Sequence, residues 1–147
     1  MKKRTLQQLI DNARRVRDDA AVRVAGAHRE ADGAQRTLDM LSSYRDEQMR
    51  NGAALSRIDP ALLRLRGRFA DKLGVAIDDQ TRTRDALHVA VERQRDALID
   101  RQRALLAFEA LQARREAAAQ QRRARLEQRD TDELAAQTAR RGPWQSR

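Results

Sequence analysis

Apolar residues recur at steps of three and four through two long segments of the chain, separated by a break at about residues 52–59. Such steps place side chains along one side of an α-helix. The first stripe comprises Leu6, Leu9, Ala13, Val16, Ala20, Val24, Ala27, Ala31, Ala34, Leu38 and Leu41. The second comprises Leu73, Ile77, Leu87, Val91, Leu98, Leu105 and Phe108. The pattern therefore predicts two long amphipathic helices.

The first predicted helix has capping signals at both ends. Thr5 and Gln8 are spaced as in a capping box, in which the hydroxyl accepts a backbone N–H of the first turn and the glutamine reaches back. Asn51-Gly52 is a suitable stop because both residues tolerate the left-handed conformation of a helix C-cap. We therefore expect this helix over about residues 5–51.

The second predicted helix begins after the turn. Asp59 is a suitable N-cap, and Pro60 suits the first helical position. Ile58 can pack on Leu63 as a hydrophobic staple. Gly142-Pro143 ends the helix, which is expected over about 60–141, with a bend or break near 67–74 and 130 and a disordered tail at 142–147.

The connection between the helices limits how they can pair. About eight residues cannot carry the chain back along a helix to start a parallel partner, so the helices should run antiparallel. The expected fold is all-α, a long antiparallel two-helix coiled-coil hairpin forming a single domain over 1–147, with residues beyond roughly 115 overhanging as a single helix. Because two helices enclose no core, the leucines between them should keep one flank in water.

Composition narrows the class of protein. With 36% charged and 3% aromatic residues among 147, too few bulky apolar side chains remain for an ordinary globular core. There is no cysteine, and no apolar run approaches the ~20 residues of a membrane span, so a cytoplasmic location is expected. The net charge is +9, and residues 101–147 carry 11 basic against 6 acidic side chains. The positive electrostatic field of these charges speeds the diffusional encounter of the protein with acidic partners.

No set of residues suggests catalysis. The chain has no glycine-rich phosphate loop and no cysteine nucleophile, and His28 and His88 lie on different predicted helices, where we expect them at the surface. We predict a protein that is not an enzyme, with no catalytic residue, no cofactor and no metal site.

The arginine-rich segment 114–129 is a candidate for contact with nucleic acid. Against this, Glu116, Glu127 and Asp130 interleave with its arginines, and it has no aromatic residue for base stacking. A basic helical nucleic-acid-binding protein is therefore kept as an alternative, and no nucleic acid is expected as partner. Binding of this segment to an anionic membrane is favoured even less, because the segment has no bulky apolar face to insert into the lipid.

Two apolar clusters flank the turn. The segment Leu38–Tyr44 holds more apolar residues than one helix seam can bury, and an antiparallel hairpin brings it beside Phe69–Ile77. One interpretation is a thicker core that closes the hairpin. The other, slightly favoured, is an exposed docking patch, because aromatic and aliphatic side chains dominate interface energetics.

The chain resembles the family of the flagellar export protein FliJ, a coiled-coil component of the flagellar type III export apparatus. The resemblance rests on Asp18-Asp19-Ala20-Ala21, on Leu38-x-Met40-Leu41-x-x-Tyr44, on Phe69-x-x-x-Leu73-x-x-Ala76-Ile77, and on the tail from Leu111-Gln112-x-Arg114 to Glu127-Gln128-Arg129-x-x-Asp132-Glu133. Together with the length and the order of these segments, it covers nearly the whole chain.

The resemblance implies a hairpin similar to the central stalk of rotary ATPases, seated in the hexameric export ATPase. It also implies contact with the export gate and with export chaperones, and a position at the inner membrane through these protein partners. The gate-facing residues carried over by position are Thr37, Leu41, Tyr44, Gln48, Phe69, Leu73, Ala76 and Gln80. The equivalent protein of a virulence type III secretion system remains an alternative.

The basic end suggests a second surface. A narrow helical pair whose end carries the N-terminus and an arginine-rich overhang suits insertion into a ring pore with acidic loops. The predicted ATPase contacts are Arg14, Arg15, Arg114, Arg115, Arg122 and Arg123.

Overall fold

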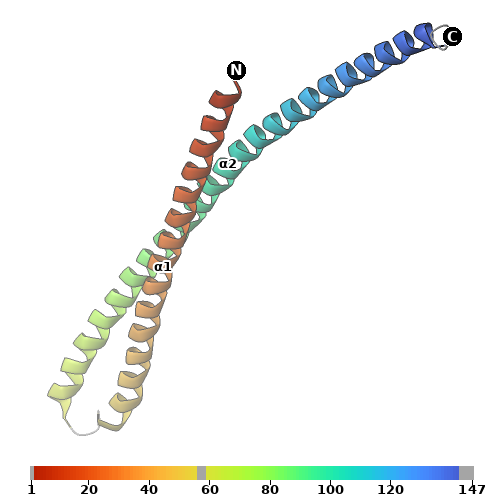
Figure 1. The fold of residues 1–147 in the computed structure, drawn as a ribbon. Helices are drawn as coiled ribbons and strands as arrows, with labels where there is room; N and C mark the ends of the chain where they lie inside the picture. The colour runs from red at the N-terminus through yellow and green to blue at the C-terminus, as the bar shows by residue number, and fades with distance from the viewer. Residues whose placement is uncertain (1, 56–58, 143–147) are drawn as a thin grey trace. The chain divides into compact units, whose positions relative to one another are not determined.

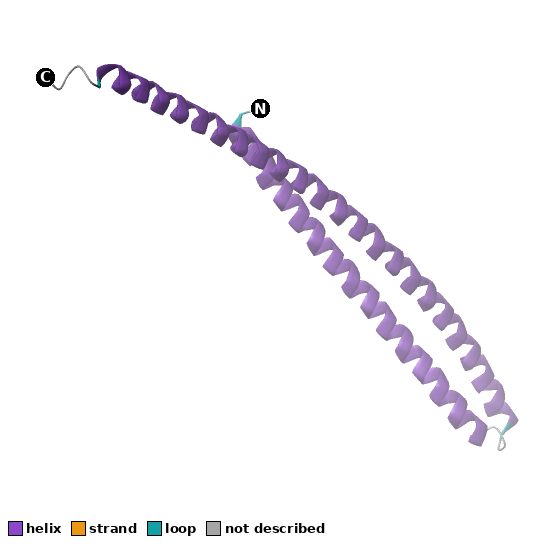
Figure 2. Ribbon diagram, turned by 90° about the vertical axis from the view of Figure 1, so that its right-hand side faces the viewer, coloured by secondary structure: helices purple, strands orange, loops and turns teal. Residues whose placement is uncertain are grey.

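The fold consists of two long helices that pack against each other. The computed structural model describes residues 2–55 and 59–142. Within them, α1 spans Lys3–Leu55 and α2 spans Pro60–Arg141 (Figure 1). Both described ranges are free of strands (Figure 2). The predicted all-α fold of two packed helices is therefore confirmed.

The chain divides into two compact units. The terminal unit combines Met1–Ala13 with Arg103–Arg147, and the hairpin unit is Arg14–Gln102. The division cuts both helices, so each unit contains one segment of α1 and one segment of α2. Each unit also has an apolar cluster of its own.

The hairpin unit is held by an apolar cluster and by polar contacts between its two helical segments. Leu38, Leu73 and Ile77 are buried together, and Leu41 packs against them. Further from the turn, the Gln80 amide donates to the Ala34 carbonyl at 3.1 Å, and Arg95 Nη2 lies 3.0 Å from His28 Nε2. Later residues of α2 thus meet earlier residues of α1, which makes the pairing antiparallel.

The terminal unit buries its apolar side chains more completely than two helices were expected to allow. Leu6 is 2% exposed, Ile10 0% and Leu105 4%. The expectation that the leucines between the helices keep one flank in water is wrong for Leu6 and Leu105. The partly buried side chains of Ala13, Phe108 and Leu111 pack around this cluster and cover the open flank.

The apolar stripes occupy the interface between the helices. Every residue of both predicted stripes is buried or half-buried. The interface also includes residues outside the stripes, above all Ile10, which no solvent reaches. The spacing thus identified the buried side of both helices, although it did not identify every buried residue on that side.

Both predicted ends of α1 need correction. The Leu6 N–H donates to the Lys2 carbonyl at 3.1 Å, so the helix is already wound before Thr5, which is not its cap. At the other end, α1 continues through Asn51-Gly52 to Leu55, and no glycine of the described residues has positive φ. Gly52 therefore keeps ordinary helical geometry and does not form the left-handed C-cap.

The start of α2 is fixed by Asp59. Its carboxylate accepts the Ala61 N–H at 3.0 Å, and its carbonyl accepts the Leu63 N–H at 3.1 Å. This is the geometry of an N-cap, with Pro60 in the first helical position. Ile58, the other half of the expected staple, lies outside the described residues.

α2 runs without a break to Arg141, through both places where a bend or break was expected. Near residue 130 the polar side chains bond within the helix. Thr131 donates to the Glu127 carbonyl at 2.8 Å, and the Gln128 amide donates to Asp132 at 3.0 Å. Such contacts are compatible with a continuing helix. Of the tail expected to be disordered, residues 143–147 lie outside the described residues.

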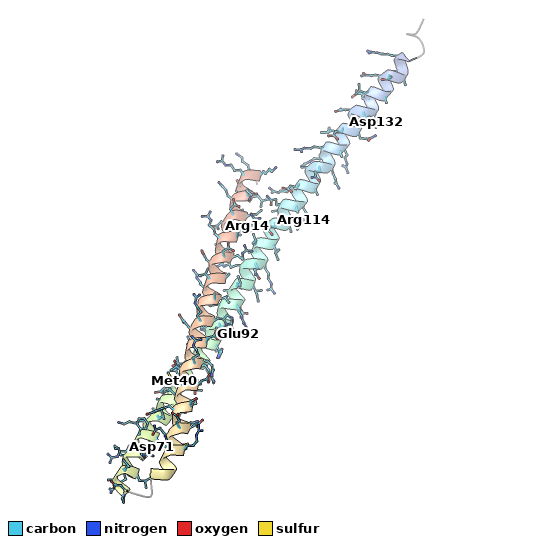
Figure 3. All side chains as sticks on the ribbon, turned by 60° about the horizontal axis from the view of Figure 1, so that its bottom comes forward. Arg14, Met40, Asp71, Glu92, Arg114 and Asp132 are labelled. Atoms are coloured by element: carbon cyan, nitrogen blue, oxygen red, sulfur yellow. The ribbon has the colours of Figure 1, made fainter. Side chains whose placement is uncertain are left out.

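The last part of α2 is a single exposed helix. The last half-buried residue of α2 is Ala119, which lines a shallow groove with Lys3 and Leu6 of α1. Every residue from 120 to 142 is exposed, and Asp132 in Figure 3 marks this stretch. Neither helix, over its described residues, combines the length and apolar character of a membrane span.

Candidate interaction surfaces

An aromatic pair lies near the turn of the hairpin unit. Tyr44 on α1 and Phe69 on α2 meet edge to face, with ring centroids 6.0 Å apart and ring planes at 84°. The two side chains are nevertheless 43% and 44% exposed. Large aromatic side chains held in place but open to solvent are the type that anchors protein interfaces.

The eight predicted gate-facing residues differ in exposure. Tyr44, Phe69, Thr37 and Ala76 are exposed, and the Thr37 hydroxyl donates to the Gly33 carbonyl of its own helix at 3.1 Å. Gln48 is half-buried beside the aromatic pair.

The remaining three predicted residues contribute to the pairing of the helices. Leu73 is 8% exposed, and half-buried Leu41 packs on the same cluster. The Gln80 amide bonds across the helices to the Ala34 carbonyl. Leu38, Leu73 and Ile77 form the core that the first interpretation predicted. Tyr44 and Phe69 remain exposed, as a docking patch requires, and docking at this patch stays a prediction.

A groove beside the aromatic pair was missed by the sequence analysis. It has a volume of about 490 Å³ and lies between the two helical segments near the turn. Its lining residues are Arg45, Gln48, Met49, Gly52, Leu63, Arg66, Gly67, Phe69, Ala70 and Leu73. The signal available in the sequence was the run Leu62-Leu63-x-Leu65 directly after Pro60, which the apolar stripe did not use.

The predicted ATPase contacts are divided between the two units. Arg14 and Arg15 are exposed residues of the hairpin unit. Arg114, Arg115, Arg122 and Arg123 belong to the terminal unit, where half-buried Arg115 lines the groove beside Lys3 and Leu6.

The exposed helix of the terminal unit carries a basic face that extends beyond the predicted residues. Arg122, Arg125 and Arg129 follow one another at steps of three and four, so they lie on one side of α2. They surround exposed Leu126 in a shallow surface depression. None of these three arginines has an ion pair with another described residue. The predicted ATPase contacts did not include Arg125 and Arg129, although both lie in the arginine-rich segment 114–129 of the sequence analysis.

The two histidines have different surroundings. His88 is exposed, as expected, whereas His28 is half-buried next to Arg95. Because a guanidinium only donates, the His28 Nε2 atom accepts this hydrogen bond. The described residues contain no group of three or more side chains suited to hold a metal ion.

Ion pairs contribute little to the stability of these surfaces. Several ion pairs of the hairpin unit join near neighbours on one helix, such as Arg17 with Asp18 at 2.7 Å and Arg95 with Glu92 at 3.1 Å. Exposed local pairs contribute about 0–1 kcal/mol each. Apolar packing and the contacts between helices therefore dominate the structure.

These features define an all-α coiled-coil protein with an exposed aromatic pair in one unit and an exposed basic helix in the other. The sequence model of the family described as "Flagellar FliJ protein" matches residues 1–143, and the chain belongs to this family. Neither the curated proteins nor the solved structures yield a match. The family makes the chain a component of the flagellar export apparatus.

Proposed function

We propose that the chain is a non-enzymatic component of the flagellar type III export apparatus. In this proposal it binds the hexameric export ATPase as a central stalk, promotes the assembly and activity of the ATPase, and links it to the export gate and to export chaperones. The observation that carries the proposal is the family match over residues 1–143. Catalysis belongs to the ATPase, so we assign this chain no catalytic residue and no cofactor.

The gate surface is assigned to the hairpin unit. Tyr44 and Phe69 form its centre because they combine fixed geometry with exposure. Thr37 and Ala76 are exposed and extend the surface, and Gln48 lies at its edge. The gate surface is supported by three residues that hold the two helices together. Leu41 and Leu73 do so by apolar packing, and Gln80 does so by a hydrogen bond.

The ATPase surface is assigned to the arginines. Arg114, Arg115, Arg122 and Arg123 lie on α2 of the terminal unit, and Arg14 and Arg15 are exposed in the hairpin unit. An exposed arginine that forms no ion pair with another described residue, such as Arg122, attracts acidic loops of a ring and speeds their encounter. We place the protein in the cytoplasm, attached to the inner membrane at the flagellar base through its protein partners.

The proposal is tested with purified hexameric export ATPase. We expect the chain to copurify with the ATPase and to raise its turnover. The double variant Arg122→Glu and Arg123→Glu should lose the stimulation, because it reverses the charge of an exposed helix without touching an interface between helices. Arg64→Glu, at an exposed position of the hairpin unit, is the matched control and should stimulate like wild type.

Two results would contradict the proposal. One is a lack of copurification and stimulation even at low salt, where charge attraction is strongest. The other is tight binding to DNA or RNA with a steep salt dependence and indifference to the ATPase, which would favour the nucleic-acid alternative.

A further inference from the structure

The groove near the turn contains a charged donor without an acceptor. Arg66 is half-buried, and its Nη1 atom is buried with no hydrogen-bond partner among the described residues. Such an arrangement is unfavourable, because the guanidinium loses hydration without gaining a hydrogen bond. An acceptor brought by another molecule would satisfy this donor.

Gly52 allows the guanidinium to reach this position. A Cβ atom added at Gly52 would lie 3.0 Å from Arg66 Nη1, so the end of the arginine side chain would have to shift by a few tenths of an ångström. Since Gly52 has no positive φ, its role here is the close approach of a side chain from α2 to α1. The Arg66 guanidinium on α2 thus lies close to the Gly52 backbone on α1.

Apolar side chains form much of the rest of the groove. Met49 is 69% exposed, Leu63 50% and Phe69 44%, and all three line it. Apolar side chains of this size gathered around an open groove are typical of a binding site for a partner segment.

The charged residues that line the groove are all basic. They are Arg45 and Arg66, and none of the described residues brings an acidic side chain to the lining. The Arg45 Nε atom lies 3.9 Å from the Asp46 carboxylate, which is too long for a hydrogen bond. Charge complementarity therefore favours a partner segment that carries a carboxylate.

We propose that this groove binds a short amphipathic segment of the export gate. One carboxylate of the segment accepts a hydrogen bond from Arg66 Nη1, and a neighbouring apolar side chain lies between Met49 and Leu63. This inference rests on the proposed function and specifies the chemistry of the gate segment. A second copy of the chain is the poorer occupant, because its net charge of +9 opposes a basic groove.

The test is the dissociation constant, Kd, of the complex between this chain and the purified cytoplasmic part of the export gate, measured by calorimetry. Arg66→Gln should raise the Kd about tenfold or more, because a charge-assisted hydrogen bond is lost. Gly52→Ala should also raise the Kd, but by less than Arg66→Gln, since it keeps every charge and shifts the guanidinium by a few tenths of an ångström. Arg68→Gln, outside the groove, and Gly74→Ala, where an added Cβ meets nothing within 4 Å, are matched controls that should bind like wild type.

Exchanging the charges of the two partners identifies the acidic residue of the gate that supplies the carboxylate. Arg66→Glu should bind weakly, and replacing one acidic residue of the gate by lysine should restore the affinity. The inference is overturned if Arg66→Gln binds like wild type with its helical content intact, or if no single lysine restores binding. Dimerisation of the chain that Arg66→Gln abolishes would overturn it too, because the occupant would then be a second copy.

The failure of this inference can be told apart from the failure of the proposed function. If Tyr44→Ala with Phe69→Ala abolishes gate binding while Arg66→Gln does not affect it, the gate surface stands and the groove inference alone is wrong. If the wild-type chain does not bind the gate at all, the gate part of the proposed function fails and the groove inference fails with it.

Discussion

Ile10 is the most enclosed residue of the terminal unit, with 0% of its surface exposed. The sequence pattern selected Leu6 and Leu9 and passed over Ile10, because a helical period of 3.6 accepts steps of both three and four. The choice between these steps depends on the partner helix, which supplies Leu105 and Phe108. One helix alone could not provide this information.

Ile10→Ala should destabilise the terminal unit by about 2–4 kcal/mol, because it removes buried apolar atoms and leaves a cavity. The measurement is hydrogen exchange of the terminal unit's amides, read as a free energy of opening. Val22→Ala, at a position that is 66% exposed, is the control and should change stability by less than about 0.5 kcal/mol. Equal protection in Ile10→Ala and wild type would show that the cluster does not hold the unit together.

The candidate gate site was predictable only in part. The resemblance identified Tyr44 and Phe69, which the structure places in contact. The role of Gln80 between the helices was not predictable, because its acceptor is a backbone carbonyl 46 residues earlier. Arg66 carried no signal either, since the close approach of its guanidinium to Gly52 joins two helices across the turn and is not encoded in the apolar spacing.

At the scale of the element, the start of α2 was more predictable than the ends of α1. Asp59 and Pro60 act together, and the proline limits where the helix can begin. Thr5 and Asn51-Gly52 permit a helix end without requiring one, so α1 extends beyond both. Capping residues therefore indicate possible boundaries, and the neighbouring sequence decides whether they are used.

The exposed helix from residue 120 onward lacks tertiary packing over its described length. Because most helical stability in proteins comes from packing, this segment should open readily. We expect amides 120–141 to exchange much faster than those around Leu105 in the free protein. Adding the export ATPase should slow their exchange, while unchanged exchange in a saturated complex would contradict the assignment of this helix to the ATPase.

At the scale of the whole molecule, composition indicated the class of protein, and the family match identified the apparatus. A chain with 36% charged residues and a net charge of +9 has extensive surface for partners and little interior for a substrate. Composition could not say which partners bind, because an arginine-rich surface attracts many acidic molecules. The identity of the partners therefore remains the main prediction.

The central claim is that this chain connects the export ATPase to the export gate. The most direct measurement is retention of purified ATPase on an immobilised cytoplasmic part of the gate, with and without the chain. We expect the chain to increase retention markedly, and we expect the variant Tyr44→Ala with Phe69→Ala, helical content unchanged, to abolish the increase. Equal retention of the ATPase with and without the chain would contradict the account.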